Sequence, residues 1–559
     1  MGKYSTIKNT ADAKRIYDDA LRSPPGFISA DVETPSLTDQ TPLGVGFALP
    51  TGEAYYIPID EPDFPYHLFD GRTRTRVIWY NAPFDLGRKC FGPHMDLDKV
   101  EDAIIPTRMQ GFLDNTLEAV SSAWDEKGII RTHAPGMQAL LDEFGVETVT
   151  ELPEKEVANK CMNDAKATME VWHRYRPTIS DDYYRQEIEF LRSLLAMSQV
   201  GLKVDQDQLL PIDRELEGEM ARYKGYTDNF GFNPNSPKQV AALLNAEGIW
   251  LPETRKGNPM TGEDVLKHIP HPVAQLTILS RKYGKLHNTY THKWIGAERV
   301  YSTYKMDAAT GRTMSADDNL QNLPKGNRQG SIVPKAGPIR SVFVPDYGIG
   351  TKWDLRQIEL RMLAYLSGDE AMLAILNDPN GDLHNETQAA CQAMGYMLTR
   401  TEAKNFNFGM IFGGSPGVIA QYTNITDYGF IQKVIQAWQT RFPTAWAWIE
   451  NQKIVGLNTL KVYTMFGREL NLETSSKGVL SDKHVENCAV NWPIQGSAAE
   501  CFKRIGNEIT QHIVPREFHR SQIHDEFWEN GGWVIPKEIE HCLAGMWLPI
   551  DQEIVTRYG

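Results

Sequence analysis

The segment GTKWDLRQIELRMLAYLSGD, residues 350–369, limits the possible folds of this chain more than any other stretch. It is apolar enough to be buried, yet it contains Asp354, Arg356, Glu359 and Arg361. A buried carboxylate costs several kcal/mol of folding free energy unless it is paired or holds a cation. The apolar run before Asp354 predicts a core strand, so the fold has to bring a positive charge to the end of that strand.

The length and composition indicate a soluble globular enzyme of several domains. A chain of 559 residues is too long for one core, so about two to four domains are expected. Hydrophobic residues at 41% and charged residues at 23% are ordinary for such proteins. No run approaches the roughly 18 apolar residues that a membrane span needs. The N-terminus has no apolar signal core, and we expect no membrane association.

Cysteine usage and net charge restrict the compartment and the partners. The absence of a CxxC pair argues against a disulfide framework or a zinc site and favours a reducing interior. A net charge of -14 argues mildly against wholesale binding of nucleic acid. Phosphate binding needs only a local basic track, however, and carboxylate clusters that hold cations would themselves make the total negative. The six cysteines are Cys90, Cys161, Cys391, Cys488, Cys501 and Cys542.

The order of periodic segments predicts an α/β chain of more than one domain. Strand patterns with Gly and Pro punctuation fill 27–60, and helical patterns dominate 100–175. Pro177 and the acidic residues after it form a plausible boundary. Residues 206–300 are again helical, and 307–347 are rich in loops. The chain shows no internal repeat and no low-complexity tract.

Four carboxylates near the N-terminus form a first candidate site. In ISADVETP, Asp31 and Glu33 are two apart at the end of an apolar strand, so both side chains point to one face. VIWYNAPFDLG repeats the arrangement with Asn81 and Asp85, and Asp164 follows on a helix. Each alone is an ordinary surface carboxylate at a strand end. Together these hard oxygen ligands could hold two divalent cations, one activating water and one stabilising the leaving oxygen.

These residues resemble the three exonuclease motifs of the proofreading domain of family A DNA polymerases. The flank DVETPSLTDQTPLGVGFALPTGEAYYIPI also matches the first strands of that domain. The resemblance implies an RNase H-like (DnaQ-like) 3′–5′ exonuclease domain over residues 1–178, a mixed sheet with helices that hydrolyses DNA from the 3′ end. It further implies four catalytic carboxylates that are also the metal ligands, namely Asp31, Glu33, Asp85 and Asp164.

Two positions depart from the pattern of that domain. The family places a Tyr four residues before the last Asp, to orient the attacking water, and this chain has Lys160 there. Related exonucleases place a His base five residues before it, where this chain has Asn159. The metal ligands are intact, whereas the water-orienting group is missing or supplied from elsewhere. We therefore expect proofreading that could be slow.

The opening segment has its own resemblance. WDLRQIELR is similar to the first polymerase motif of family A, which implies that Asp354 ends a palm strand and binds two catalytic magnesium ions. SQIHDEFWEN matches the third motif and supplies Asp525 between His524 and Glu526, on a hairpin between apolar strands. Alone, this tripeptide is typical of a solvated turn. Two carboxylates that hold two metals about 3.5–4 Å apart suit in-line displacement at phosphorus.

The same resemblance assigns the chemistry around that hairpin. The catalytic residues are Asp354, Asp525 and Glu526, and the polymerase metals bind at Asp354, Leu355 and Asp525. Glu359 matches the steric gate that packs under the sugar and rejects a 2′-hydroxyl, with Gln357 in the same nucleotide site. This favours deoxyribonucleotides over the substrates of single-subunit RNA polymerases.

RTEAKNFNFGMIFGG, residues 400–414, predicts a nucleotide-binding helix. Arg400, Lys404, Phe408 and Phe412 recur every four residues and share one slowly turning face. Two cations followed by two aromatic rings suit a triphosphate followed by a base and sugar, whereas an ordinary amphipathic helix would put its cations opposite its Phe residues. The helix resembles the fingers helix of the family, with Phe412 in place of Tyr and Phe408 predicting discrimination against dideoxynucleotides. His384 in GDLHNET matches the fingers His that contacts phosphate.

Several polar segments resemble the family's duplex-binding elements. TGRTMSADDNLQNLP, residues 310–324, is similar to the segment along the primer-template minor groove, and NWPIQGSAAE adds a helix to the same groove. Such groups would check pair geometry through the degenerate acceptors of the groove, without sequence preference. Asn487 stands where the family often has an Arg. The implied DNA-binding residues are Arg312, Asn319, Gln321, Asn491, Gln495, His524, Lys285 and Arg340, with Lys282, Lys325, Arg328 and Lys335 as further phosphate contacts.

The resemblance covers nearly the whole chain and implies a right-hand polymerase domain over 179–559. Its thumb is expected at about 186–300, its palm at about 301–370 and 485–559, and its fingers at about 371–484. The expected activity is primer extension on a DNA template with Mg²⁺, two ions per active site, or Mn²⁺ as substitute. Expected partners are primer-template DNA, dNTPs and replisome proteins such as a helicase-primase and a single-strand-binding protein.

The compact make-up favours a bacteriophage replicative polymerase. The spacing from GLKVD to KLHNTYT leaves no room for a thioredoxin-type processivity insertion, and no 5′ nuclease is expected before the exonuclease domain. We expect a monomer in the cytoplasm of a bacterial host. Three alternatives stay open: a repair polymerase with a weak or vestigial exonuclease, a DNA exonuclease whose polymerase half only grips duplex, and a non-catalytic DNA-binding scaffold.

Overall fold

The structure is a computed structural model of the 559-residue chain. It describes residues 5–6, 26–36, 39–60, 64, 66, 69–72, 74–125, 136–254, 256–323, 337–411, 416–423, 425, 427–475, 480–543 and 545–558. Within these ranges, no helix is both long and apolar enough to cross a membrane.

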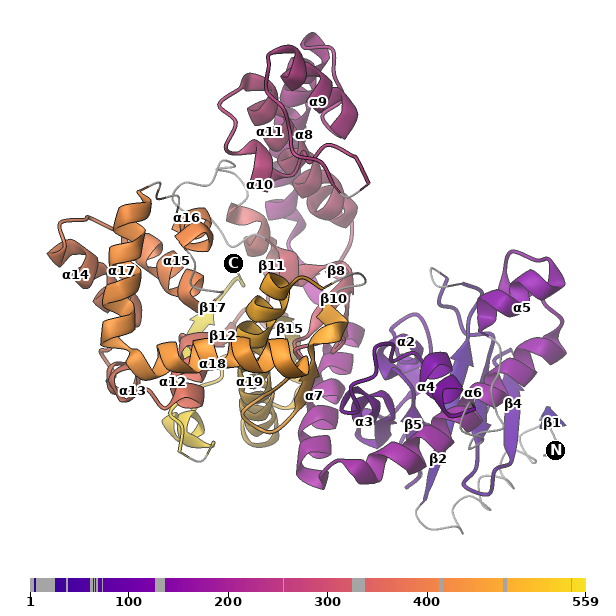
Figure 1. The fold of residues 1–559 in the computed structure, drawn as a ribbon. Helices are drawn as coiled ribbons and strands as arrows, with labels where there is room; N and C mark the ends of the chain where they lie inside the picture. The colour runs from indigo at the N-terminus through magenta and orange to yellow at the C-terminus, as the bar shows by residue number, and fades with distance from the viewer. Residues whose placement is uncertain are drawn as a thin grey trace.

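The N-terminal part is built on a mixed sheet whose strand order is β1-β4-β3-β2-β5-β6 (Figure 1). β2, β3 and β4 form an antiparallel meander, and β5 and β6 extend it parallel to β2. The expected strands in 27–60 are therefore present. The strands are β1 (Ser5–Thr6), β2 (Phe27–Glu33), β3 (Gly44–Ala48), β4 (Ala54–Pro58), β5 (Arg76–Trp79) and β6 (Val100–Asp102).

Helix α6 (Glu154–Tyr175) packs across β2, β3 and β4 and completes one core of this part. The helix approaches closely because it presents Ala158, Cys161 and Ala165 to the sheet. A Cβ on Gly46 would lie 2.7 Å from the backbone of Cys161, so this crossing requires glycine. The surrounding short helices are α2 (Ala82–Asp85), η2 (Gly92–His94), η3 (Leu97–Lys99), α3 (Ile104–Arg108), α4 (Leu117–Asp125), α5 (Met137–Phe144), η4 (Val149–Glu151) and η5 (Arg176–Thr178).

Helix α7 (Asp181–Val200) connects this part to the rest of the molecule. It begins at Ser180, whose side chain accepts a hydrogen bond from the Tyr183 amide, close to the expected boundary. α7 contacts β6 on one side and α19 and β15 on the other. The buried ion pair between Lys503 and Glu187, at 2.6 Å, joins it to α19. α7 is therefore part of the base of the molecule, although the range expected for the thumb includes most of it.

The central element is a four-stranded antiparallel sheet of order β15-β16-β12-β17. Trp353 stacks on Phe527 of the neighbouring strand at 4.8 Å between ring centroids, and both rings lie against Phe502 of α19. These aromatic contacts fix the strands that end at the expected carboxylates. The elements are β12 (Gly350–Leu355), β15 (His519–Ile523), β16 (Glu526–Asn530), β17 (Ile550–Val555), α12 (Ile358–Ser367), α19 (Asp482–His512), η11 (Arg516–Phe518) and η12 (Lys537–His541).

A helical tower rises from one side of this sheet (Figure 1). Its core contains Val240, Leu244, Leu266 and Ile278. The tower consists of α8 (Gln206–Asn229), α9 (Pro237–Ala246), α10 (Glu263–Leu266), α11 (Pro272–Lys285) and the π-helix η6 (Leu286–Thr291). Its base contains η7 (His292–Trp294), β7 (Leu202–Val204), β8 (Arg299–Val300), β9 (Ser302–Lys305), β10 (Met314–Asp317), η8 (Leu320–Asn322), η9 (Gly337–Val342) and β11 (Phe343–Val344).

A second helical group lies on the opposite side of the sheet from the N-terminal part (Figure 1). The carboxylate of Asp369, which is 1% exposed, holds two of its helices together. One oxygen accepts from the Met372 amide of α13, and the other accepts from Thr444 and Ala445 of α18, each at 3.0–3.1 Å. The group contains α13 (Glu370–Leu376), α14 (Leu383–Ala393), α15 (Arg400–Ile411), α16 (Pro416–Thr423), α17 (Tyr428–Arg441) and α18 (Pro443–Thr459). After α18 come β13 (Lys461–Tyr463), β14 (Glu469–Asn471) and η10 (Leu472–Ser475), which return to the N-terminal part, where the Asn471 side-chain amide donates to the Gly111 carbonyl at 3.2 Å.

Replacing Asp369 with Ala tests this shared cap. The change leaves donors unpaired at the starts of both α13 and α18, so we expect their opening free energy to fall by about 2–4 kcal/mol. The control Asp427→Ala removes the single exposed cap of α17 and should cost about 1 kcal/mol. Hydrogen exchange of the helix amides measures both. Equal losses in the two variants would contradict the double cap.

Candidate active site

The central sheet brings carboxylates from three strands to one edge. Asp354, near the end of β12, lies opposite Glu526 of β16 and opposite Asp551 of β17 in the strand register. Asp525 immediately precedes Glu526, in the turn from β15. Two residues some 170 positions apart are therefore neighbours because the strands that carry them pair, as the motif order predicts.

Strained backbone presents these side chains. His524 has φ 59 in the β15–β16 turn, and Gln357 has φ 51 as the N-cap of α12, just after Asp354. Residues other than glycine adopt this left-handed region rarely, and such residues concentrate at functional sites. Asn81, with φ 67, occupies the same region before Asp85 in the N-terminal part. Each candidate site thus has a left-handed residue close to one of its carboxylates.

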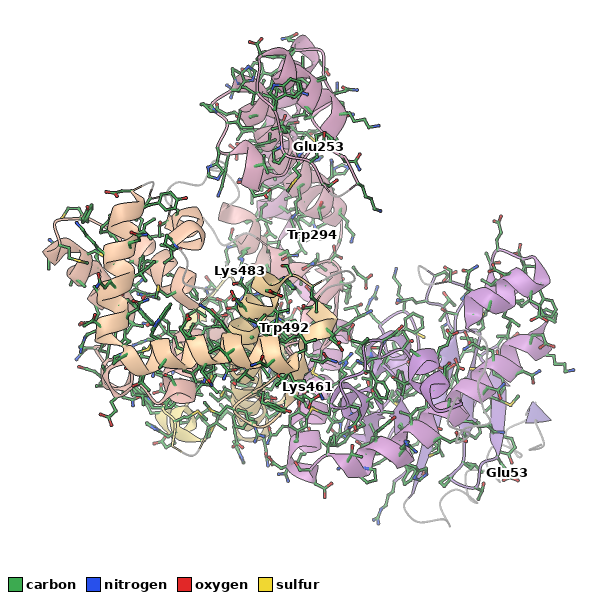
Figure 2. The ribbon with its side chains drawn as sticks, in the orientation of Figure 1. Glu53, Glu253, Trp294, Lys461, Lys483 and Trp492 are labelled. Atoms are coloured by element: carbon green, nitrogen blue, oxygen red, sulfur yellow. The ribbon has the colours of Figure 1, made fainter. Side chains whose placement is uncertain are left out.

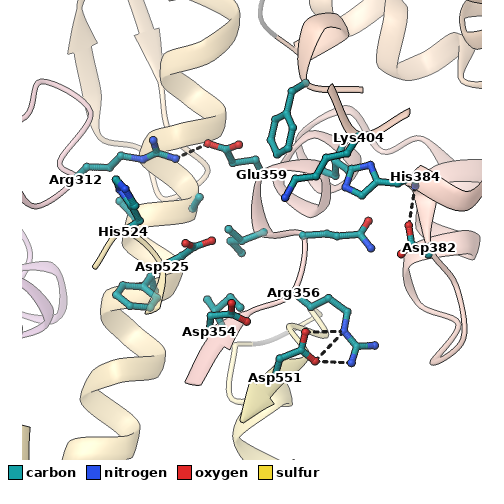
Figure 3. Close-up of a pocket in the computed structure, with 18 of the residues that line it drawn as sticks. Arg312, Asp354, Arg356, Glu359, Asp382, His384, Lys404, His524, Asp525 and Asp551 are labelled. Atoms are coloured by element: carbon teal, nitrogen blue, oxygen red, sulfur yellow. Dashed lines mark hydrogen bonds and ion pairs between the residues drawn. The ribbon is translucent and has the colours of Figure 1, made fainter. Parts of the chain in front are cut away.

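A cavity of about 950 Å³ opens between the central sheet and α15, and Figure 3 shows its lining. The carboxylates of Asp354 and Asp525 point into it from one side, and Lys404 enters from the other (Figure 3). The predicted face of the 400–411 helix is thereby turned toward the carboxylates. The sequence-predicted residues that line the cavity are Arg312, Asp354, Leu355, Gln357, Glu359, His384, Arg400, Lys404, Phe408, His524 and Asp525.

The cations and carboxylates of the cavity are largely paired with one another. Arg312 donates to Glu359, and Arg400 donates to Asp382, the N-cap residue of α14. Lys404 lies over the Phe408 ring, 5.6 Å from its centroid. An anionic ligand that binds here would replace Asp382 as the ion-pair partner of Arg400. Because Arg400 is exposed, this exchange of partners costs little free energy.

His384 is neutral in this cavity. It is 3% exposed, its ring Nδ1 accepts from the Asn407 amide nitrogen at 3.1 Å, and burial lowers its pKa to about 4. A neutral imidazole with Nδ1 as acceptor carries its proton on Nε2, which can donate a hydrogen bond. His384 can therefore orient an oxygen of a ligand without adding positive charge.

Of the expected duplex-binding residues, Arg312 and His524 line this cavity and the others lie outside its lining. Two of those others, Gln321 and Arg340, are engaged within the protein. Gln321 is 7% exposed and its amide donates to Thr313 and Gln522 at 2.9 and 2.8 Å. Arg340 is 5% exposed, donates to the Leu323 carbonyl and lies 3.5 Å from Glu526. Arg340 therefore braces the β15–β16 hairpin rather than presenting an exposed charge to phosphate.

The other expected contacts are distributed as follows. Lys285 is exposed at the end of α11, and Asn491 and Gln495 are half-buried on α19. Asn319 caps η8, with its side-chain oxygen accepting from the Asn322 amide at 3.2 Å. Phe412, Lys325, Arg328 and Lys335 lie outside the described residues.

The N-terminal sheet gathers the second carboxylate set. One carboxylate oxygen each from Asp31 and Glu33 lies within 4.8 Å of the other and of the Cys161 thiol. Asp85 is 4% exposed and accepts from the Val32 amide at 3.1 Å. On α6, one turn apart, Lys160 forms an ion pair with Asp164. The predicted ligands are thus adjacent, and an ammonium group stands beside them.

These carboxyl groups are buried and repel one another, and the nearby positive charge does not offset the two effects, so their pKa values are raised. Burial first, and then Asp164, raises the pKa of Asp31 to about 7. Burial and the Asp31 charge raise the pKa of Glu33, and burial likewise raises the pKa values of Asp85 and Asp164. Burial opposes the charged form of Lys160, but these carboxylates raise its pKa and keep it an ammonium. A set of hard oxygen donors in this condition fits divalent cations.

Sequence reasoning missed two carboxylates that shape the sites. Asp551 of β17 pairs with Asp354 of β12 in the strand register and accepts a hydrogen bond from the Arg356 side chain at 3.0 Å. Asp102, which is fully buried, accepts from the amides of Asn81, Ala82 and Ile104 at 2.8–3.0 Å and so fixes the strained turn before Asp85. The sequence feature that could have indicated Asp102 is its place at the end of the short strand VED. For Asp551 it is the apolar run WLPI directly before it.

Comparison with known proteins agrees with this geometry. The model of a family described as DNA polymerase family A matches residues 206–530, more than half of the chain. The chain belongs to DNA polymerase family A. The matched region of this family A chain contains α8 through β16, and therefore Asp354, α15 and Asp525.

Relatives of this family A chain include bacterial enzymes. The thermostable DNA polymerase I of Thermus filiformis is 32% identical over 366 residues, which are 61% of this chain and 43% of that protein. DNA polymerase I of Pseudomonas aeruginosa is 28% identical over 527 residues, 86% of this chain and 56% of that protein. The chain thus spans about half the length of these relatives.

A solved structure shares the fold of this family A chain over nearly all of it. It is described as the POL domain of Pol1 from M. smegmatis in complex with a DNA primer-template and dNTP. The TM-score is 0.75 with 19% sequence identity, over 99% of each chain. At this identity the likeness concerns the fold.

The raised pKa values predict a pH dependence of stability. Asp31 binds a proton below about pH 7 in the fold but only below about 3.8 when unfolded. Metal-free protein should therefore lose stability as the pH rises from about 4 to 7. Asp31→Asn should raise the melting temperature of the N-terminal part at pH 8 and raise it less than half as much at pH 5. The exposed control Asp60→Asn should leave both values unchanged. A wild-type melting temperature that rises over this interval, with no gain in Asp31→Asn, would contradict the assignment.

Proposed function

We propose that the chain is a DNA-directed DNA polymerase that extends a primer on a DNA template. The observation that carries the proposal is the shared cavity: the carboxylates of Asp354 and Asp525, from separate strands, face the Arg400–Lys404–Phe408 side of α15. Membership of family A and the names of the bacterial relatives support the same activity. A DNA exonuclease with a merely gripping second half, or a scaffold, would not need this arrangement.

The proposed roles follow from charge and position. Asp354, Asp525 and the Leu355 carbonyl would hold divalent ions, with Mg²⁺ preferred and Mn²⁺ as substitute, which would acidify the primer 3′-hydroxyl and neutralise the triphosphate. Arg400 and Lys404 would attract the triphosphate. Neutral His384 would donate a hydrogen bond to a phosphate oxygen without adding a positive charge that would repel the metal ions. Glu526, braced by Arg340 and bonded to the Trp528 indole at 2.5 Å, would keep the hairpin in place.

Selection of the sugar is proposed for Glu359 and its neighbours. Glu359 lines the cavity between Asp354 and the α15 face, and its ion pair with Arg312 holds it in position. A carboxylate so fixed can block a 2′-hydroxyl by contact. Phe408, half-buried beside Lys404, would pack on the sugar and base. Gln357 and His524, the left-handed residues that line the cavity, would set the directions of Asp354 and Asp525.

We further propose a 3′–5′ exonuclease of RNase H-like fold in the N-terminal part. The adjacent Asp31, Glu33, Asp85 and Asp164 support it, because their donor set fits divalent cations. The Lys160–Asp164 ion pair favours a second candidate, a polymerase whose exonuclease is weak, since an ammonium beside the ligands competes with a bound cation. Replication of a phage genome by a monomer in a bacterial cytoplasm, with helicase-primase and single-strand-binding partners, stays a prediction.

Primer extension tests the polymerase assignment. Asp354→Ala removes a proposed metal ligand and should lower the extension rate about 1,000-fold or more, with duplex binding retained. Asp551→Asn also removes a cavity carboxylate, but one that Arg356 already neutralises. It should therefore lower the extension rate by less than about 10-fold. Extension by Asp354→Ala at the wild-type rate would refute the proposal, and equal losses in both variants would show that only cavity charge matters.

Degradation of a mismatched primer tests the exonuclease separately. Asp31→Ala/Glu33→Ala should abolish degradation with magnesium while primer extension continues. Lys160→Tyr frees Asp164 from its ion pair and restores a water-orienting hydroxyl, so degradation should rise about 10-fold or more. Lys155→Tyr places the same residue on the exposed face of α6 and should change nothing. Degradation that survives the double variant, or falls in Lys160→Tyr, would contradict these roles.

A further inference from the structure

A cluster of ionisable side chains in the helical tower belongs to neither candidate site. It consists of Asp213 on α8, His287 in the π-helix η6 and His292 at the start of η7. One ligand atom of each residue lies within 4.8 Å of the other two. None of the three lines the large cavity or belongs to the N-terminal carboxylate set. The nearby Trp294 marks the place at the tower base in Figure 2.

The π-helix explains how two histidines five positions apart meet. In a π-helix residues i and i+5 share one face, whereas in an α-helix the i+5 residue turns away. The rings of His287 and His292 consequently stack, with centroids 4.8 Å apart and planes at 24°. Such π-helical turns are rare and occur frequently at functional sites. The π-helical backbone therefore brings these two imidazole rings together.

His287 presents an unpartnered nitrogen to a carboxylate. The residue is 4% exposed, and its Nδ1 lies 2.9 Å from the Asn288 side-chain oxygen. Because that oxygen only accepts, Nδ1 carries the hydrogen, and Nε2 of the neutral ring is an acceptor. Nε2 has no hydrogen-bond partner among the described residues and lies 3.5 Å from Asp213 Oδ1. Two acceptors face each other here, which requires a proton or a cation between them.

The spacing fits a metal ion. Besides the 3.5 Å contact, His292 Nδ1 lies 3.7 Å from Asp213 Oδ2. In a tetrahedral zinc site with bonds of about 2.0–2.1 Å, neighbouring ligand atoms are about 3.3 Å apart. Thr291 donates to Asp213 Oδ1 at 2.6 Å, and Asn288 holds the far nitrogen of His287. Hydrogen bonds of this kind, made by residues next to the ligands, orient the ligand side chains toward a metal ion.

We propose that Asp213, His287 and His292 bind one divalent transition-metal ion of the zinc class. Two imidazoles and one carboxylate suit Zn²⁺, whereas Mg²⁺ prefers oxygen ligands alone. The exposed position of His292 leaves the fourth ligand position to water. The cysteine spacing, which argued against a zinc site, carries no information on a site made of histidine and aspartate. The proposal is independent of the polymerase assignment.

The ion would fasten the tower to its base. Asp213 belongs to the long helix α8, and both histidines belong to the segment that leads to Trp294. Trp294 is 1% exposed and donates to Asp318 at 2.9 Å, so this segment is anchored in the base. A metal bridge would add a cross-link between α8 and that anchor. Zn²⁺ should therefore raise the thermal stability of the tower.

Zinc binding by the full-length chain tests the proposal. The protein is stripped with EDTA and titrated with Zn²⁺ in excess Mg²⁺, which occupies the carboxylate sites, with a competing chelator as reporter. We expect one tightly bound Zn²⁺ per chain and about 100-fold weaker binding in His287→Ala. His292→Ala, which removes an exposed side chain and keeps the fold, should weaken binding in the same direction. His268→Ala, an exposed tower histidine, is the matched control.

Cobalt substitution supplies the second measurement. Co²⁺ in this site should give the intense visible bands of a tetrahedral ion, and His292→Ala should lose them. Wild-type protein that retains no Zn²⁺ would overturn the proposal. So would an ion whose affinity and Co²⁺ spectrum are the same in His292→Ala as in wild type, because that ion is held elsewhere. If His287→Ala does not fold, His292→Ala decides.

Discussion

Carboxylates held together without enough positive charge are the constraint on which this structure depends. Asp354, Asp525 and Asp551 meet at one edge of the central sheet, and Asp31, Glu33 and Asp85 meet at the separate N-terminal sheet. The protein neutralises some of them with its own cations, as Arg356 does for Asp551 and Lys160 for Asp164. The remainder fit cations from solution, and this fit is the basis on which we propose phosphoryl chemistry for both parts of the chain.

Backbone strain is the means by which both sites hold their carboxylates. Gln357, His524 and Asn81 are left-handed residues with side chains, each within a few residues of a proposed ligand. Glycine would adopt these angles at lower cost, but it would leave the turns free to move. The turn at Asn81 is fixed by Asp102, whose carboxylate accepts from the amides of Asn81 and Ala82 and also from that of Ile104. The strain is thus part of how the ligands are positioned.

Local patterns predicted what depends on neighbouring residues in the chain. The strands in 27–60 and the shared face of Arg400, Lys404 and Phe408 followed from periodicity. The meeting of Asp354 with Asp525, residues far apart in the chain, followed only from the resemblance of their segments to two motifs of one family. Strand register was out of reach, so Asp551 was missed. The burial of Gln321 and Arg340 was missed because their partners, Gln522 and Glu526, come from a distant hairpin. The meeting of His287 with His292 needs a π-helix, which helical periodicity does not indicate.

The most direct test of the central claim is to locate the cations. Crystals of the full chain with a primer-template, a non-hydrolysable dNTP analogue and Mn²⁺ would be measured at the manganese absorption edge. The account predicts anomalous peaks between the carboxylates of Asp354 and Asp525, in contact with the triphosphate. Peaks that bind only one of these two residues, or a triphosphate seated away from Arg400 and Lys404, would contradict it.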